Sequence, residues 1–157
     1  MNIRSASKDD VPQILNFIQL LGEYEKLSHE VVATEQLLHD TLFGKKSYAE
    51  VLIAETDSNQ SAGFALFFSN YSTFLAKPGI HLEDLFVLPE FRGLGLGKAL
   101  LKELARLTLE RDCGRLEWAV LDWNKPAIDF YQSQGAILMN GWTTNRVTGE
   151  ALINLAS

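Results

Sequence analysis

The stretch Arg92-Gly93-Leu94-Gly95-Leu96-Gly97-Lys98 is a glycine-rich turn between a predicted strand and a predicted helix. The strand covers residues 80–88 (IHLEDLFVL). The helix is predicted because one face of it gathers four leucines and a threonine, namely Leu100, Leu101, Leu104, Leu107 and Thr108. The first backbone N–H groups of a helix are free, and glycines let a phosphate approach them without a Cβ clash. The pattern predicts a cradle for a pyrophosphate; the alternative is a flexible strand-to-helix turn.

Two familiar nucleotide-binding loops do not fit this turn. A dinucleotide fingerprint counted from Gly93 requires glycine at its sixth position, where Lys98 stands. A Walker A loop requires Ser or Thr after Gly-Lys, where Ala99 stands. The turn does fit Arg-x-x-Gly-x-Gly beginning at Arg92, in which successive amides and the arginine side chain hold a diphosphate.

The rest of the chain predicts an alternation of strands and helices. Before the turn, we expect a strand at 3–6, a helix opened by Ser7 and Asp10, a helix capped by Thr34, and a hairpin of strands at 49–55 and 63–71. After it, we expect a strand at 115–121, a helix at 126–134 ended by Gly135, and further strands from Ala136, with turns at Asn140-Gly141 and Thr148-Gly149. This order predicts a mixed α/β sandwich.

Length, charge and cysteine content narrow the class of protein. The chain has 157 residues, of which 46% are hydrophobic, which predicts a single domain over 1–157. A net charge of −6 argues against nucleic acid or an anionic membrane as partner. The single cysteine, Cys113, excludes an internal disulfide, and no long apolar run is present, so we expect a cytoplasmic protein. The spacing of His29, His39 and His81 is not that of metal ligands, so no metal is expected.

The turn and three further segments resemble the GNAT superfamily of acyl-CoA-dependent N-acetyltransferases. Residues 82–87 (LEDLFV), 123–131 (WNKPAIDFY) and 22–25 (GEYE) are similar to the diamine (spermidine/spermine) acetyltransferases and their thialysine-acetylating relatives. The resemblance implies a GNAT fold, with a mixed, mostly antiparallel central sheet flanked by helices on both faces. It also implies acetyl-CoA as co-substrate, a small amine as acceptor and a homodimer.

Two residues are candidates for catalysis. An alkyl amine, with a pKa near ~10.4, is mostly protonated at neutral pH, so a carboxylate should help to remove its proton, and Glu83 is the candidate. Alternation along a strand would place Glu83 and Asp84 on opposite faces. The alternative for both acids is a solvent-exposed strand end, or pairing with Arg4 or Arg115. The resemblance implies that Tyr131 is the general acid for the leaving thiolate; an arbitrary tyrosine would more often be packing its ring on the core.

The resemblance also implies the binding residues. Acetyl-CoA would be held by Leu85, Phe86 and Val87 of the strand, by Arg92, Gly93, Leu94, Gly95, Leu96, Gly97 and Lys98 of the turn, and by Asn124, Pro126 and Ala127. Asn124 also has the position of a helix N-cap, and the two roles are compatible. The cationic acceptor would be bound by Tyr24, Glu25, Glu83 and Asp84, through an aromatic face and carboxylates.

We therefore expect an N-acetyltransferase that works by direct attack of a small primary amine on acetyl-CoA in a ternary complex. Residues 71–74 (YSTF) replace an Asp and a Trp of the polyamine enzymes, which favours a shorter monoamine or a diamino acid over spermidine. The alternatives are a protein or peptide N-acetyltransferase and a non-catalytic acyl-CoA sensor.

Overall fold

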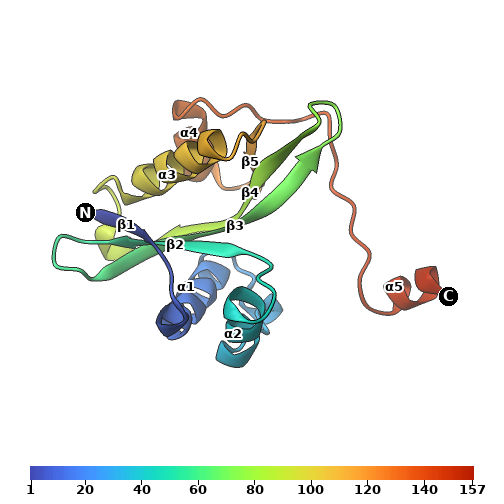
Figure 1. The fold of residues 1–157 in the computed structure, drawn as a ribbon, viewed down its shortest axis with the longest axis horizontal. Coiled ribbons are helices and arrows are strands. Elements are labelled where there is room, and N and C mark those ends of the chain that lie inside the picture. The colour runs from blue at the N-terminus through green and yellow to red at the C-terminus, as the bar shows by residue number, and fades with distance from the viewer. The chain divides into compact units, whose positions relative to one another are not determined.

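The computed structural model describes residues 1–157, which form two compact units, Met1–Ala119 and Val120–Ser157. The first unit contains a five-stranded sheet in the order β1-β2-β3-β4-β5 (Figure 1). The strands are β1 (Asn2–Ser5), β2 (Glu50–Glu55), β3 (Ser61–Ser72), β4 (Lys77–Val87) and β5 (Leu116–Trp118). Neighbouring strands are antiparallel except for β4 and β5, which are parallel.

Helices cover both faces of this sheet. The helices α1 (Val11–Tyr24) and α2 (Glu35–Phe43) lie on one face, and α3 (Leu96–Glu110) lies on the other (Figure 1). Short 3-10 turns lie at Lys8–Asp10, Ser28–Glu30 and Pro89–Phe91. The predicted mixed, mostly antiparallel sheet with helices on both faces is confirmed. No helix has the length and apolar character needed to cross a bilayer.

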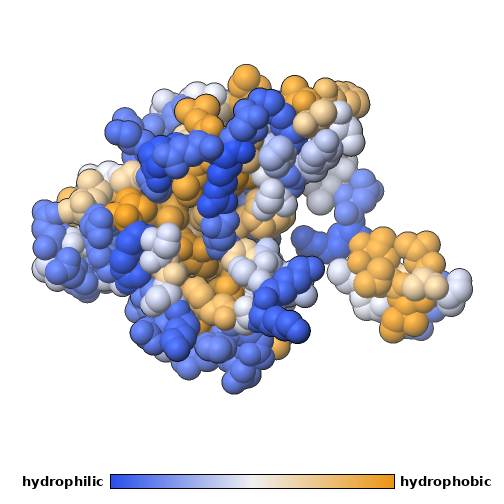
Figure 2. Space-filling model, in the orientation of Figure 1, coloured by the Kyte–Doolittle hydropathy of each residue, from blue (hydrophilic) through white to orange (hydrophobic).

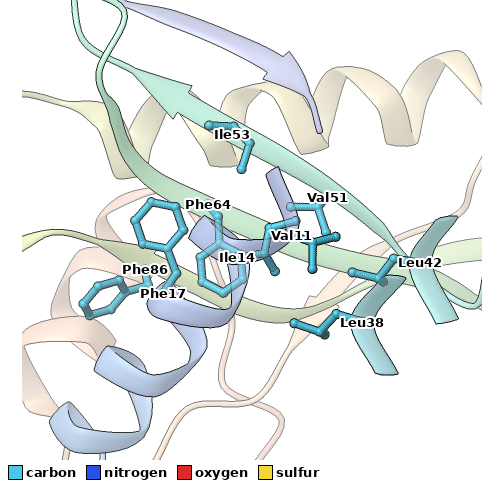
Figure 3. Packing of buried hydrophobic residues seen from close by; sticks show 9 residues of the cluster. All are labelled: Val11, Ile14, Phe17, Leu38, Leu42, Val51, Ile53, Phe64 and Phe86. Carbon is cyan, nitrogen blue, oxygen red and sulfur yellow. The ribbon is translucent and has the colours of Figure 1, made fainter. Parts of the chain in front are cut away.

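The core between α1 and the sheet is aromatic. Phe17 of α1 stacks on Phe64 of β3 with ring centroids 5.3 Å apart, and its ring is 6.4 Å from that of Phe86 on β4 (Figure 3). The remaining buried members of the cluster are Val11, Ile14, Leu38, Leu42, Val51 and Ile53. This packing holds the middle of α1 against β3 and against Phe86 of β4, two residues beyond Asp84.

The predicted helix starts are confirmed in their local contacts. The backbone N–H of Ser7 donates to the Asp10 carboxylate at 2.7 Å, and the hydroxyl of Thr34 accepts from the N–H of Leu37 at 3.2 Å. Arg4 of β1 donates to Asp10 at 2.8 Å and to Glu55 of β2 at 2.6 Å. This pairing links the start of α1 to the first two strands.

The second unit contains α4 (Lys125–Ser133) and α5 (Gly149–Ala156). Gly135 has a φ of +94°, which suits its predicted place just after α4. The prediction of further strands after Ala136 is wrong: residues 136–148 form no strand, and 149–156 are helical. A strand is stable only when a neighbour pairs with it, and no segment of this chain pairs with 136–148. The predicted turn at Thr148-Gly149 is instead the start of α5, with Thr148 as N-cap.

Candidate active site

A β-bulge in β4 sets the positions of the two candidate acids. Leu66 of β3 is opposite Asp84, while the next residue, Phe67, is opposite Leu82, so Glu83 is the extra residue in β4. A bulge interrupts the alternation of side chains along a strand. Glu83 is exposed and Asp84 is more buried, and their placement on opposite faces of the strand stays a prediction.

Asp84 is a largely buried carboxyl group beside two other acids. Burial, together with the negative charges of Glu83 and Glu25, raises the pKa of Asp84 to about 6. Burial also raises the pKa of Glu25, which follows the last residue of α1. Glu25, Glu83 and Asp84 therefore lie close enough for their charges to interact, and such a group suits an ammonium ion. That these residues bind the acceptor stays a prediction.

The burial of Asp84 predicts how the free energy of unfolding depends on pH. Because the pKa of Asp84 is raised in the folded state, its ionised form destabilises the fold above pH 6, and the cost disappears below the ordinary value near 4. We expect Asp84→Asn to raise the free energy of unfolding by about 1–3 kcal/mol at pH 8 and to leave it nearly unchanged at pH 4. Urea melts at both values measure this, with the exposed Asp122→Asn as control. An equal gain at both values would contradict the assignment.

The edge of β4 that faces β5 is paired over only three residues. Ile80, His81 and Leu82 of β4 pair with Leu116–Trp118, and β5 pairing ends there. Residues 83–87 therefore keep β3 as their strand partner on one side and have no β5 partner on the other. The segment includes Leu85, Phe86 and Val87, whose backbone the resemblance assigns to the thioester end of acetyl-CoA.

The glycine-rich turn has the backbone conformation that an anion cradle requires. Gly93 and Gly95 have φ values of +79° and +84°, in the left-handed region that favours glycine. No atom lies within 4 Å of where a Cβ would stand at either position, so the turn is open. Gly95 is the N-cap of α3 and provides no side chain to cap it, and the first helical bond runs from the N–H of Ala99 to the carbonyl of Gly95 at 2.9 Å. The amides of 96–98 thus precede the helical ladder, as in a phosphate-binding helix start.

The positive φ at Gly95 makes a substitution costly even though space is available. We expect Gly95→Ala to lower the free energy of unfolding by about 1–2 kcal/mol, because alanine is strained in the left-handed region. We also expect CoA binding to weaken about tenfold, since the amides of the turn would move. Thermal melts and calorimetric titration with CoA measure both effects. Gly141→Ala, at an equally open glycine without a positive φ, is the matched control and should change neither.

Arg92 contacts a backbone carbonyl of β4 and two aromatic rings. Its Nε donates to the carbonyl of Val87 at 2.9 Å, and its guanidinium carbon lies 5.3 Å from the Tyr24 ring and 5.4 Å from the Phe86 ring. These contacts join the end of α1, the end of β4 and the start of the turn. A contact between Arg92 and a diphosphate stays a prediction.

One neighbour of the candidate base was missed in the sequence. His81 is two residues before Glu83 on β4, and its Nε2 lies 3.6 Å from a carboxylate oxygen of Glu83. From the sequence, His81 is a candidate only for metal binding. The sequence carried no signal for this contact, because the bulge at Glu83 interrupts the alternation that would otherwise relate residues i and i+2.

In the second unit, Asn124 and Tyr131 belong to the same helical segment. Asn124 is buried and caps α4, its Oδ1 accepting from the N–H of Ala127 at 3.4 Å, with Pro126 in the first turn. Tyr131 is half-buried, with its ring 5.5 Å from that of Phe130. The N-cap role predicted for Asn124 is confirmed, and the roles of Asn124, Pro126 and Ala127 toward CoA stay predictions.

A cavity in the first unit is lined by other residues. It has a volume of about 230 Å³ and is lined by parts of β1, β2, α2 and α3. Two arginines line it, and both are paired with acids: Arg111 with Glu50 at 2.7 Å, and Arg106 with Glu103 at 2.6 Å. No candidate site residue lines this cavity.

Comparison with known proteins agrees with this arrangement. The profile of the Acetyltransferase (GNAT) family matches residues 15–136. A thialysine N-epsilon-acetyltransferase from Bos taurus is 39% identical over 98% of this chain and 96% of its own length. An L-ornithine N5-acetyltransferase from Arabidopsis thaliana is 33% identical over 96% of this chain and 85% of its own. Among solved structures, an integron cassette protein from the mobile metagenome of V. cholerae is similar with a TM-score of 0.81, 29% identity, and coverage of 99% of this chain and 96% of that one.

The fold, the open glycine turn and these matches together show that the chain belongs to the GNAT acetyltransferase family. It is an acetyl-CoA-dependent N-acetyltransferase, with acetyl-CoA as its co-substrate.

Proposed function

We propose that this enzyme acetylates a primary amine of a small cationic acceptor, by direct attack of the amine on acetyl-CoA in a ternary complex. The observation that carries the proposal is the acidic group of Glu25, Glu83 and Asp84 at the end of α1 and the bulge of β4. The adjacent Tyr24 ring adds an aromatic face. Carboxylates and an aromatic face together attract an ammonium group.

Glu83 removes the proton of the bound ammonium, directly or through one water. Its side chain is about half exposed (56%), so water can reach its carboxylate. The removal is needed because an alkyl ammonium holds its proton until about pH 10. The neutral amine then forms a bond to the thioester carbonyl carbon, and backbone N–H groups of residues 85–87 stabilise the charge that develops on the oxygen.

The remaining steps concern the CoA end. The amides of the glycine turn and of the first turn of α3 hold the pyrophosphate, with Lys98 adding positive charge. Tyr131 donates its phenolic proton to the sulfur as the C–S bond breaks. The nitrogen loses its second proton as the amide forms, which balances the proton given to the sulfur, and the phenol is restored by way of solvent. A phenol with a pKa near ~10 can protonate a thiolate of pKa near ~8.5 at low cost.

The acceptor that fits best is a short diamino acid of the thialysine or ornithine type. The relatives from Bos taurus and Arabidopsis thaliana carry those two substrates in their names. The end of β3 and the following turn supply Tyr71, Ser72, Thr73 and Phe74 and no carboxylate, and Phe74 is almost fully exposed. A long polyamine would therefore lack an anion for its far amine at this place.

The test is a panel of acceptors at saturating acetyl-CoA, with CoA release as the signal and mass spectrometry of the acetylated product. We expect thialysine and ornithine to give the highest kcat/KM, with spermidine and putrescine lower and a lysine peptide lowest. A preference for the peptide would favour a protein acetyltransferase. Binding of CoA without turnover of any amine would favour an acyl-CoA sensor.

We also propose that the enzyme is a homodimer. Several large apolar side chains are exposed in the segment after α4, including Ile137, Trp142, Ile153 and Leu155. Hydrophobic residues cover much of α5 (Figure 2). Exposed apolar surface of this kind is typical of a protein interface. Light scattering should give twice the mass of the 17.6 kDa chain, and a monomer at micromolar concentration would contradict the proposal.

A further inference from the structure

The side chain of His81 is held next to Glu83. The two residues lie on β4, and the distance from His81 Nε2 to Glu83 Oε2 is 3.6 Å. The imidazole ring also packs against the ring of Phe68, with centroids 5.0 Å apart and an angle of 34° between the planes. Phe68 is the register partner of His81 on β3, so the strand pairing itself sets this contact.

The charged groups around His81 are mainly acidic. On β4 they are Glu83 and, next to it, Asp84, whose own neighbour is Glu25 at the end of α1. On β5 the register partner of His81 is Glu117, which is paired with Arg115 at 2.8 Å. The adjacent residues of β3 are Phe68 and Asn70, neither of which titrates.

We propose that His81 is a positioning residue that acts through Glu83. Glu83 removes the proton from the amine, and His81 then accepts this proton from Glu83. This inference rests on the proposed function, because it concerns the base of that reaction. The side chain of His81 is about 29% exposed, so water can reach it. A small rotation of the half-exposed Glu83 side chain, or one water, closes the 3.6 Å gap to hydrogen-bond length.

The proton balance of this step is simple. The substrate ammonium gives one proton to the Glu83 carboxylate, which passes it to the neutral imidazole of His81, and the resulting imidazolium releases it to bulk water. Glu83 is then again a carboxylate for the next turnover. Imidazole suits this task because free histidine titrates near pH 6.5, close to neutral working conditions.

The experiment is the pH profile of kcat/KM for the preferred amine, from pH 5.5 to 9, in the parent and in His81→Gln and His81→Phe. The phenylalanine variant retains an aromatic ring that can pack against Phe68 and removes the nitrogens that carry the proton. His39→Gln is the matched control, because His39 also lies beside an acid, Asp40, at 3.7 Å, but on α2.

We expect both His81 variants to lose about tenfold in kcat/KM near pH 7, to change the acid limb of the profile, and to leave KM for acetyl-CoA unchanged. Added imidazole should restore part of the activity, and more in His81→Gln than in His81→Phe. His39→Gln should match the parent throughout.

Two results would overturn the proposal while leaving the proposed function intact: a His81→Gln profile that superimposes on the parent, or a uniform loss at every pH that imidazole does not restore. A parent enzyme that acetylates no amine would instead overturn the proposed function, and this inference with it.

Discussion

Replacing Tyr131 by phenylalanine is expected to lower kcat by about 100-fold or more. The change removes one hydroxyl and keeps the ring that packs beside Phe130. Without the phenol, the departing thiolate must take its proton from water, and loss of a positioned general acid typically costs 10²–10⁴-fold. Steady-state CoA release with the preferred amine measures the effect.

The effect of Tyr131→Phe on the KM values shows whether the hydroxyl acts in the chemical step or in substrate binding. The KM values for both substrates should change little, since the hydroxyl acts on the bond that breaks and not on ground-state binding. Tyr48→Phe, at an exposed tyrosine in the first unit, is the control and should retain parental activity. If Tyr131→Phe retained more than a third of the parental kcat, another group would be the general acid.

The second large effect is expected in Glu83→Gln. Glutamine has nearly the same shape and cannot accept the proton of the ammonium, so we expect kcat/KM for the amine to drop by about 100-fold at pH 7. The loss should become smaller toward pH 9.5, because a growing fraction of the amine is then neutral without help from the enzyme. Rate measurements across this range test the role of Glu83 as a base.

The control for this variant is Glu90→Gln, which removes the same charge from an exposed position in the 3-10 turn after β4. It should leave the pH profile unchanged. A loss in Glu83→Gln that is constant from pH 7 to 9.5 would mean that Glu83 binds the amine and does not deprotonate it.

Much of the fold followed from local patterns in the sequence. The helices α1 and α3 have apolar stripes with helical periodicity, and β2 and β3 are joined by a short polar turn, so each element could be predicted without its neighbours. The glycine turn could also be predicted, because Gly93 and Gly95 mark positions with positive φ whatever surrounds them.

The features that were missed depend on pairing between distant segments. The bulge at Glu83 exists only relative to β3, and β5 is three residues long because its pairing with β4 ends at Leu82. The strands predicted after Ala136 had suitable residues but have no partner within this chain. Local sequence preference sets neither register nor partner.

Some residues of the candidate site could likewise be predicted from the sequence, and others could not. Glu83 could be chosen from chemistry alone, as an acid on an apolar strand, whereas Tyr131 and Asn124 depended on the resemblance of 123–131 to a known family. The burial of Asp84 next to Glu25, and the contact of His81 with Glu83, could not be predicted, because each needs the bulge and the end of α1 to be placed first.

The most direct test of the central claim is the initial rate of CoA release, measured while acetyl-CoA and thialysine are varied together. Direct transfer within a ternary complex predicts amine-dependent release, with double-reciprocal lines that intersect and one acetylated amine formed per CoA. Parallel lines would show an acetylated enzyme intermediate, and CoA release that does not depend on any small amine would contradict the proposed acceptor class.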